Sequence, residues 1–145
     1  MLMGYPMSAH LYYGQRGLFW ASKLDLHVRI VKRLLEQGFA ACYKVHPERA
    51  SPTTEIKENL GAVVVDGKIE KTNLSGDFIL ITYSSTSALP FLLSTKKPII
   101  FINSQTEDWK PSYLETLAKR VQLLKADIYD AGQIVFDESA LPKIL

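Results

Sequence analysis

The sequence predicts an α/β fold: a doubly wound, mainly parallel sheet with helices on both faces. Short apolar runs of strand type alternate with amphipathic helical stretches along the chain, which is typical of layered α/β domains. Two of these runs, residues 78–81 and 98–102, are apolar throughout, as in strands that are covered on both faces. Helices between successive strands imply right-handed parallel crossovers, and these produce a sheet with helices on both sides.

Length and composition limit the possible classes of protein. A chain of 145 residues predicts one domain, residues 1–145, at about 150 residues per domain. Its 17 basic and 15 acidic residues give a net charge of +2, which is too balanced for a nucleic-acid-binding protein. The single cysteine, Cys42, excludes an internal disulfide and fits a reducing compartment. No apolar stretch reaches ~18 residues and no signal peptide is recognisable, so we expect a cytoplasmic domain without a membrane span.

The first strand and first helix come from local signals. Residues 11–14 form a short apolar run that ends in a turn containing Gly14 and Gly17. Ser22 resembles the N-cap of a helix, and Gly38 occupies the expected C′ position at its end. Steps of three and four residues predict the apolar face of this helix, which consists of Leu24, Val28, Val31 and Leu35. His27 is assigned to the helix surface and His10 to an N-terminal tail.

The remaining elements follow from apolar runs bounded by turn residues. Further strands are expected at residues 39–45, 62–65, 77–82, 98–102 and 134–136. Further helices are expected at residues 54–60, from the hydroxyl-rich run 83–87 through residue 93, at residues 112–125 and, as a terminal turn, at residues 139–145.

Four consecutive hydroxyl side chains, Ser84, Ser85, Thr86 and Ser87, follow the apolar strand at residues 77–82 and begin the next helix. A helix start presents unpaired N–H groups and about half a positive charge, so it binds anions and phosphate above all. A single hydroxyl is enough for a helix cap. The run of four therefore favours phosphate binding, with plain capping as the alternative.

A second polar cluster, His46 followed by Pro47, stands at the end of the strand expected at residues 39–45. Proline restricts the preceding histidine to extended geometry. An imidazolium there can donate to a phosphate or protonate it as it leaves, with Lys44 or Arg49 adding charge. The alternative is a surface turn with an incidental histidine. No His, Cys, Asp or Glu trio has metal-ligand spacing, so no metal is expected.

Together the His-Pro pair and the Ser-Ser-Thr run, 38 positions apart, resemble the C-terminal, donor-binding half of GT-B-type glycosyltransferases that build bacterial surface polysaccharides. Bacterial sialyltransferases and capsule-type Kdo and polysialic acid transferases carry these two motifs in this order. Residues 79–86 are also similar to a strand-Tyr-Ser-Ser element of CDP-glycerol glycerophosphotransferases. The resemblance covers residues 13–136 and implies one Rossmann-like half of a GT-B fold.

The resemblance implies metal-independent transfer from a nucleotide-activated donor, a cytidine-linked sugar or CDP-glycerol, to an acceptor hydroxyl, with no cofactor. His46 would contact the nucleotide phosphate and assist its departure, while the hydroxyls of residues 84–87 would bind that phosphate. Pro47 and Glu48 would lie near the nucleoside, and Gly14 and Gly17 would let the backbone approach the donor. Pro90 stands where many such domains have a ribose-binding Glu, which argues against the usual uridine donor.

The resemblance further implies a missing acceptor-binding half, in the same parent chain or in a separate subunit. We therefore expect no turnover from this chain alone, and a cytoplasmic location that allows peripheral contact with the inner face of the membrane. Two other classes remain open: a flavodoxin- or receiver-like binding module, and a non-catalytic Rossmann-like domain. Trp109 and Tyr113 either flank a ligand base or form a hydrophobic staple at a helix start.

Overall fold

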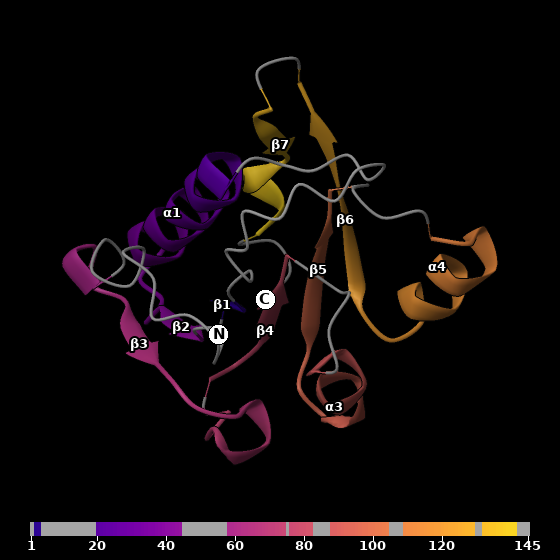
Figure 1. Ribbon diagram of the computed structural model, residues 1–145, viewed down its shortest axis with the longest axis horizontal. Helices are drawn as coiled ribbons and strands as arrows, with labels where there is room; N and C mark the ends of the chain where they lie inside the picture. Colours follow the sequence, from indigo (N-terminus) through magenta and orange to yellow (C-terminus); the bar gives the residue numbers. More distant parts are fainter. Residues whose placement is uncertain are drawn as a thin grey trace.

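The computed structural model describes residues 2–3, 20–44, 58–74, 76–82, 88–104, 109–129 and 132–141. These residues form a seven-stranded sheet with helices on both faces (Figure 1). The strands are β1 (Leu2–Met3), β2 (Cys42–Lys44), β3 (Val63–Val65), β4 (Ile79–Ile81), β5 (Ile99–Asn103), β6 (Gln122–Ile128) and β7 (Ile134–Phe136). The helices are α1 (Trp20–Glu36), α3 (Ala88–Ser94) and α4 (Pro111–Ala118), with 3-10 turns η1 (Ile69–Lys71) and η2 (Glu138–Ala140).

The strands lie in the order β3-β2-β1-β4-β5-β6-β7. All neighbouring pairs from β3 to β6 are parallel, and only the β6–β7 pair is antiparallel. The central strand β1 pairs with both β2 and β4, so that Leu2 is level with Tyr43 on one side and with Leu80 on the other. The expected α/β class with a mainly parallel sheet is therefore confirmed.

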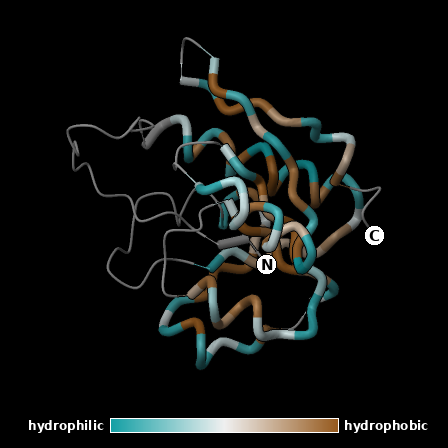
Figure 2. The backbone as a smooth tube through the Cα atoms, turned by 90° about the vertical axis from the view of Figure 1, so that its right-hand side faces the viewer, coloured by the Kyte–Doolittle hydropathy of each residue, from teal (hydrophilic) through white to brown (hydrophobic). Residues whose placement is uncertain are grey.

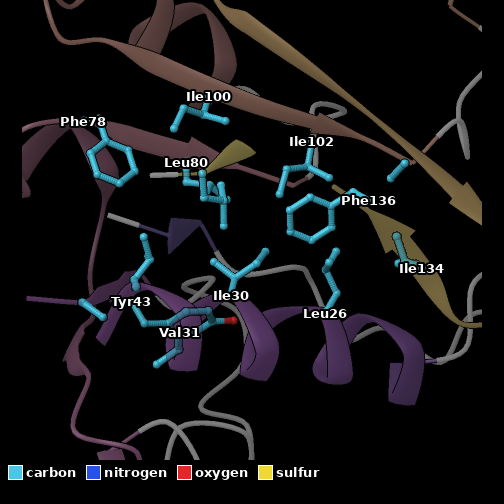
Figure 3. Packing of buried hydrophobic residues seen from close by; sticks show 14 of the residues in the cluster. Leu26, Ile30, Val31, Tyr43, Phe78, Leu80, Ile100, Ile102, Ile134 and Phe136 are labelled. Carbon is cyan, nitrogen blue, oxygen red and sulfur yellow. The ribbon is translucent and has the colours of Figure 1, made fainter. Parts of the chain in front are cut away.

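The two faces of the sheet have separate hydrophobic cores, because successive side chains of a strand point to opposite sides. On one face, Leu80, Ile100 and Ile102 pack with Leu26 and Ile30 of α1 (Figure 3). On the other face the alternate strand residues pack with α3 and α4; these are Ile79, Ile81, Ile99 and Phe101. Hydrophobic and hydrophilic stretches alternate along the described backbone (Figure 2). Strands β4 and β5 are thus covered on both faces, as their continuous apolar runs predict.

Helix α1 begins earlier than expected and turns a different face to the core. It starts at Trp20, so Ser22 lies inside the helix and the prediction of an N-cap there is wrong. Its buried side chains are Leu26, His27, Ile30, Val31 and Leu34, whereas Leu24, Val28 and Leu35 of the predicted face are only half-buried. The helix is therefore rotated relative to the prediction, which places His27 in the interior and not on the surface.

The end of α1 is as predicted. Gly38 has a φ of +83°, in the left-handed region that favours glycine. The Gly38 N–H donates to the carbonyl of Leu35 at 2.9 Å, and the Phe39 N–H donates to the carbonyl of Leu34 at 3.0 Å. This pair of hydrogen bonds is a Schellman motif, which satisfies the last carbonyls of the helix and turns the chain toward β2.

The sequence does not predict the central strand β1, because it has only two residues. The first strand was expected at residues 11–14, which lie outside the described residues, and the residues before them were assigned to a tail. A two-residue apolar run has no periodicity, so its pairing with β2 and β4, and not its own sequence, makes Leu2–Met3 a strand.

The helix expected at residues 112–125 is wrong in its second half. Helix α4 ends at Ala118, and Gln122–Ile128 form β6, a strand between β5 and β7. In the turn between them, the Arg120 guanidinium donates to the carbonyl oxygens of Leu93, Thr95 and Lys97. These bonds fix the chain at the end of α3, and strand pairing on both sides of β6 then outweighs the local helical periodicity.

The other expected elements agree in type with the structure where it describes them. Strands β2, β3, β4, β5 and β7 lie within or overlap the predicted runs, although β2 is shorter than expected. Helix α3 agrees with the predicted helix over residues 88–93, while its predicted start in residues 83–87 lies outside the described residues. The predicted terminal turn is present as η2, which Asp137 caps by accepting from the Ser139 N–H at 3.0 Å. None of the helices in the described ranges has the length and hydrophobicity needed to cross a bilayer.

Arg29 joins α1 to the C-terminal segment, which consists of the β6–β7 hairpin and η2. Arg29 Nε lies 2.9 Å from Asp25 Oδ2, and Nη1 lies 2.5 Å from Glu138 Oε1. Its Nη2 donates to the carbonyl oxygen of Ile134 in β7, the last strand of the sheet. Burial lowers the pKa of Arg29 through desolvation, but the hydrogen bonds and ion pairs with Asp25 and Glu138 outweigh this effect and raise it above its ordinary value.

Candidate functional site

The side chains predicted for the site lie outside the described residues. This holds for His46, Pro47 and Glu48, for the hydroxyls of Ser84, Ser85, Thr86 and Ser87, and for Gly14 and Gly17. What the structure does describe is the ends of the strands from which these segments start. The two glycines lie between β1 and α1 in the sequence, since β1 (Leu2–Met3) is the first strand that the structure describes.

The two motif segments start from the same edge of the sheet. The His-Pro segment follows β2, whose last residue is Lys44, and the hydroxyl segment follows Thr82, directly after β4. Strands β2 and β4 both run parallel to β1, one on each side of it. Carboxyl ends of parallel strands meet at one edge, where open α/β sheets bind ligands. Only the width of β1 separates the two starting points (Figure 1).

Buried polar side chains gather at this carboxyl edge. Among the described residues the buried polar or charged ones are His27, Lys44, Thr82 and Ser104. Lys44 ends β2, Thr82 follows β4, and Ser104 follows β5. The amino ends of the same strands present apolar residues such as Ala41 and Phe78. Buried polar groups carry a free-energy cost unless they are hydrogen-bonded, so their confinement to one edge distinguishes that edge chemically.

On the α1 face of this edge, His27 contacts two hydroxyls. Its Nε2 lies 2.9 Å from Thr82 Oγ1, and its Nδ1 lies 3.4 Å from the Tyr43 hydroxyl. The His27 and Tyr43 rings are tilted by 59° with centroids 5.6 Å apart. Burial raises the pKa of the Tyr43 hydroxyl, so this group stays neutral and is able to donate. The three side chains therefore form a buried hydrogen-bonding network in which the Tyr43 hydroxyl is neutral.

On the opposite face, the same strand buries a cation. Lys44 alternates with Tyr43 and so points away from α1. It is only 2% exposed. Desolvation lowers the pKa of its ammonium group, and the Asp66 carboxylate after β3 works against that shift. A positive charge held at the carboxyl edge is suited to an anionic ligand, which is the role that the sequence suggested for Lys44. Arg49, the other basic candidate, lies outside the described residues.

The two aromatic residues near the start of α4 do not flank a ligand base. The rings of Trp109 and Tyr113 are nearly parallel, at 9°, with centroids 4.7 Å apart. At that separation they stack directly on each other and leave no room for a third ring. The stacked geometry therefore favours a hydrophobic staple at the start of α4 over a pair that binds a ligand base.

Sequence reasoning missed His27, although a signal for it was present. His27, Ile30, Val31 and Leu34 repeat at steps of three, four and seven residues, which is the pattern of a buried helical stripe. His27 was left out of that stripe because it is polar. Tyr43 and Thr82 carry no such signal, since their contact with His27 depends on the order of the strands.

The described part of the chain holds no cluster of three His, Cys, Asp or Glu side chains that could bind a metal ion. Comparisons with protein-family models, with curated proteins and with solved structures found no significant match to this chain. The candidate site therefore stands on its sequence motifs and on the geometry of the strand ends.

Proposed function

We propose that this chain is the donor-binding, Rossmann-like half of a glycosyltransferase or glycerophosphotransferase for cell-surface polysaccharide synthesis. In this proposal it binds a cytidine-activated donor, and an acceptor-binding half in the same parent chain or a separate subunit completes the active site. The observation that carries the proposal is the arrangement of β2, β1 and β4. Their parallel pairing gives the His-Pro and hydroxyl segments a common starting edge, with one strand between them.

The chemistry follows from the residue types. Hydroxyls and backbone N–H groups in the segment between β4 and α3 bind the donor phosphate. His46 donates to the same phosphate and protonates it as the bond to the transferred group breaks. Lys44 adds a buried positive charge at the end of β2. Pro47, Glu48, Gly14 and Gly17 belong to the nucleoside side of the site. The domain works in the cytoplasm, at the inner face of the membrane where surface polymers are assembled.

A receiver-like module fits the chain less well. Such a module needs an acidic pair directly after its first strand. With β1 at Leu2–Met3, the chain continues Gly4-Tyr5-Pro6, and its first acidic residue is Asp25, inside α1. The argument against a receiver therefore holds whether the first strand is taken as Leu2–Met3 or as residues 11–14.

Thermal unfolding with added nucleotides tests the proposal, because a ligand that binds only the folded state stabilises it. We expect CMP and CDP at about millimolar concentration to raise the Tm, and to do so more than UDP or GDP. Ser85→Ala and His46→Ala should each weaken binding by roughly ten- to a hundredfold, as expected for a lost hydrogen bond to a charged group.

Ser112→Ala is the matched control, because Ser112 is an exposed hydroxyl at the start of α4. It should leave the nucleotide-induced shift of Tm unchanged. Absence of any shift with all four nucleotides would overturn the proposal, and so would an equal loss of binding in the control.

A further inference from the structure

His27 links two strand ends that do not pair with each other. It lies on α1, and its ring is 2% exposed. One ring nitrogen contacts Thr82, directly after β4, at 2.9 Å, and the other contacts Tyr43 in β2 at 3.4 Å. Strand β1 lies between β2 and β4 in the sheet. The imidazole therefore connects, above β1, two strands that share no backbone hydrogen bonds with each other.

The positions of its two contacts matter for the candidate site. Tyr43 precedes His46 by three residues, and Thr82 precedes Ser84 by two. Each contact thus holds a described position at the end of a strand, within three residues of one of the two motif segments. The side chains involved are at most 4% exposed. In such surroundings a hydrogen bond is not exchanged with water, so a displacement of one partner is transmitted to the other.

The geometry points to His27 as a positioning residue that couples the His-Pro segment to the hydroxyl segment. In the Nε2–H tautomer, Tyr43 donates to Nδ1 while Nε2 donates to Thr82 Oγ1, so a single neutral ring bonds to both hydroxyls. The contact with Thr82 is the shorter of the two and holds the end of β4 more firmly. A displacement at the end of β4 is then transmitted through His27 to the end of β2. This inference rests on the proposed function for its ligand, but the coupling itself exists without one.

The first test needs no ligand. Thr82→Val removes the hydroxyl at nearly constant volume, and amide NMR spectra report which residues respond. We expect the Tyr43 and His46 amide resonances to move in the otherwise unchanged protein, and to stay in place when Thr82→Val is made in a His27→Leu background. Resonances that move equally in both backgrounds, or that move in neither, overturn the inference. Tyr43→Phe, which removes the other contact, provides a second background if His27→Leu does not fold.

The second test uses CDP as the probe. His27→Leu should weaken CDP binding by about tenfold, as expected for the loss of a buried hydrogen bond, while His27→Gln, which keeps a donor near Thr82, should restore most of it. The effects of Ser85→Ala and His46→Ala on affinity should be coupled in the otherwise unchanged protein and additive in the His27→Leu background. Full affinity in His27→Leu, or no rescue by His27→Gln, contradicts a positioning role. If the unaltered protein binds no nucleotide, the proposed function fails, and the NMR comparison alone decides the role of His27.

Discussion

The two faces of the sheet share their strands but bury polar groups of different kinds. On the α1 face, the hydrophobic core ends in the hydrogen-bonded network of His27, Tyr43 and Thr82. On the other face of the sheet, β2 buries the side chain of Lys44. Neutral groups that bond to one another are buried at little cost, whereas a buried charge is costly unless it is compensated. The α1 face therefore buries polar groups that bond to one another, whereas the opposite face buries a basic side chain.

The largest expected effects on the free energy of unfolding come from substitutions in the two hydrophobic cores, and they show whether each face of the sheet is a packed core. Leu80→Ala removes side-chain volume on the α1 face, and Ile81→Ala does so on the other; both side chains are at most 1% exposed. Each substitution should lower the free energy of unfolding by about 2–5 kcal/mol, as is usual for truncations of buried aliphatic residues. Urea denaturation measures both values.

Val63→Ala is the control for this pair, since Val63 on β3 is 63% exposed. It should change the free energy of unfolding by less than about 0.5 kcal/mol. If Leu80→Ala or Ile81→Ala were as mild as this control, the corresponding face would not be a packed core.

The sequence predicts the cores better than it predicts the polar groups at their border. An apolar run such as residues 78–81 is compatible with little besides a strand covered on both sides, and β4 is such a strand. Where a polar residue enters a buried stripe, as His27 does, periodicity alone does not separate an interior position from a solvated one. Its assignment depends on the hydroxyls of Tyr43 and Thr82, which lie 16 and 55 residues away along the chain.

Strand pairing explains the other differences. The two residues of β1 and the seven of β6 become strands through neighbours that are distant in sequence. For the candidate site, the sequence predicts that each motif segment follows a strand. The sequence does not predict β1, and so it does not predict that a single strand separates the two motif segments. That separation is a property of the sheet, and no local pattern contains it.

Each face is also secured by one arginine, and the two arginines should respond differently to salt. Arg29 bonds to the carboxylates of Asp25 and Glu138 and to one carbonyl, whereas Arg120 bonds to three carbonyls. Arg29→Met and Arg120→Met should each lower the free energy of unfolding by about 1–3 kcal/mol, because they leave polar partners unsatisfied. Raising the ionic strength from about 0.1 M to about 1 M should shrink the effect of Arg29→Met more, since salt screens ion pairs.

Arg33→Met controls for the loss of an arginine from α1. Arg33 lies one turn after Arg29, its Nε is buried without a hydrogen-bond partner, and its guanidinium is 3.8 Å from the exposed Glu36. This substitution should not lower the free energy of unfolding, because the ion pair with the exposed Glu36 contributes little and the buried Nε has no hydrogen bond to lose. A destabilisation equal to that of Arg29→Met would show that the bonds of Arg29 to the hairpin are not what stabilises the α1 face.

The smallest expected effects come from the adjacent residues Tyr43 and Lys44, and they have opposite signs. Burial raises the pKa of Tyr43, so above its ordinary value of about 10 the unfolded chain loses a proton that the folded chain keeps. Stability then falls with pH, by up to about 1.4 kcal/mol per unit. Burial lowers the pKa of Lys44, so just below its ordinary value of about 10.4 the folded chain loses its proton first. Stability rises with pH in that window.

Urea denaturation at pH values from about 9 to about 11.5, a range that spans both ordinary pKa values, separates the two groups. Tyr43→Phe should remove part of the decline at the alkaline end, and Lys44→Met should remove the rise that precedes it. Tyr129→Phe, at a tyrosine that is 61% exposed on the β6–β7 hairpin, is the matched control and should keep the slope of the unaltered protein. If Lys44→Met left the rise intact, the ammonium would not be desolvated. The buried polar groups of the two faces would then differ only in the hydrogen-bonded network on the α1 face.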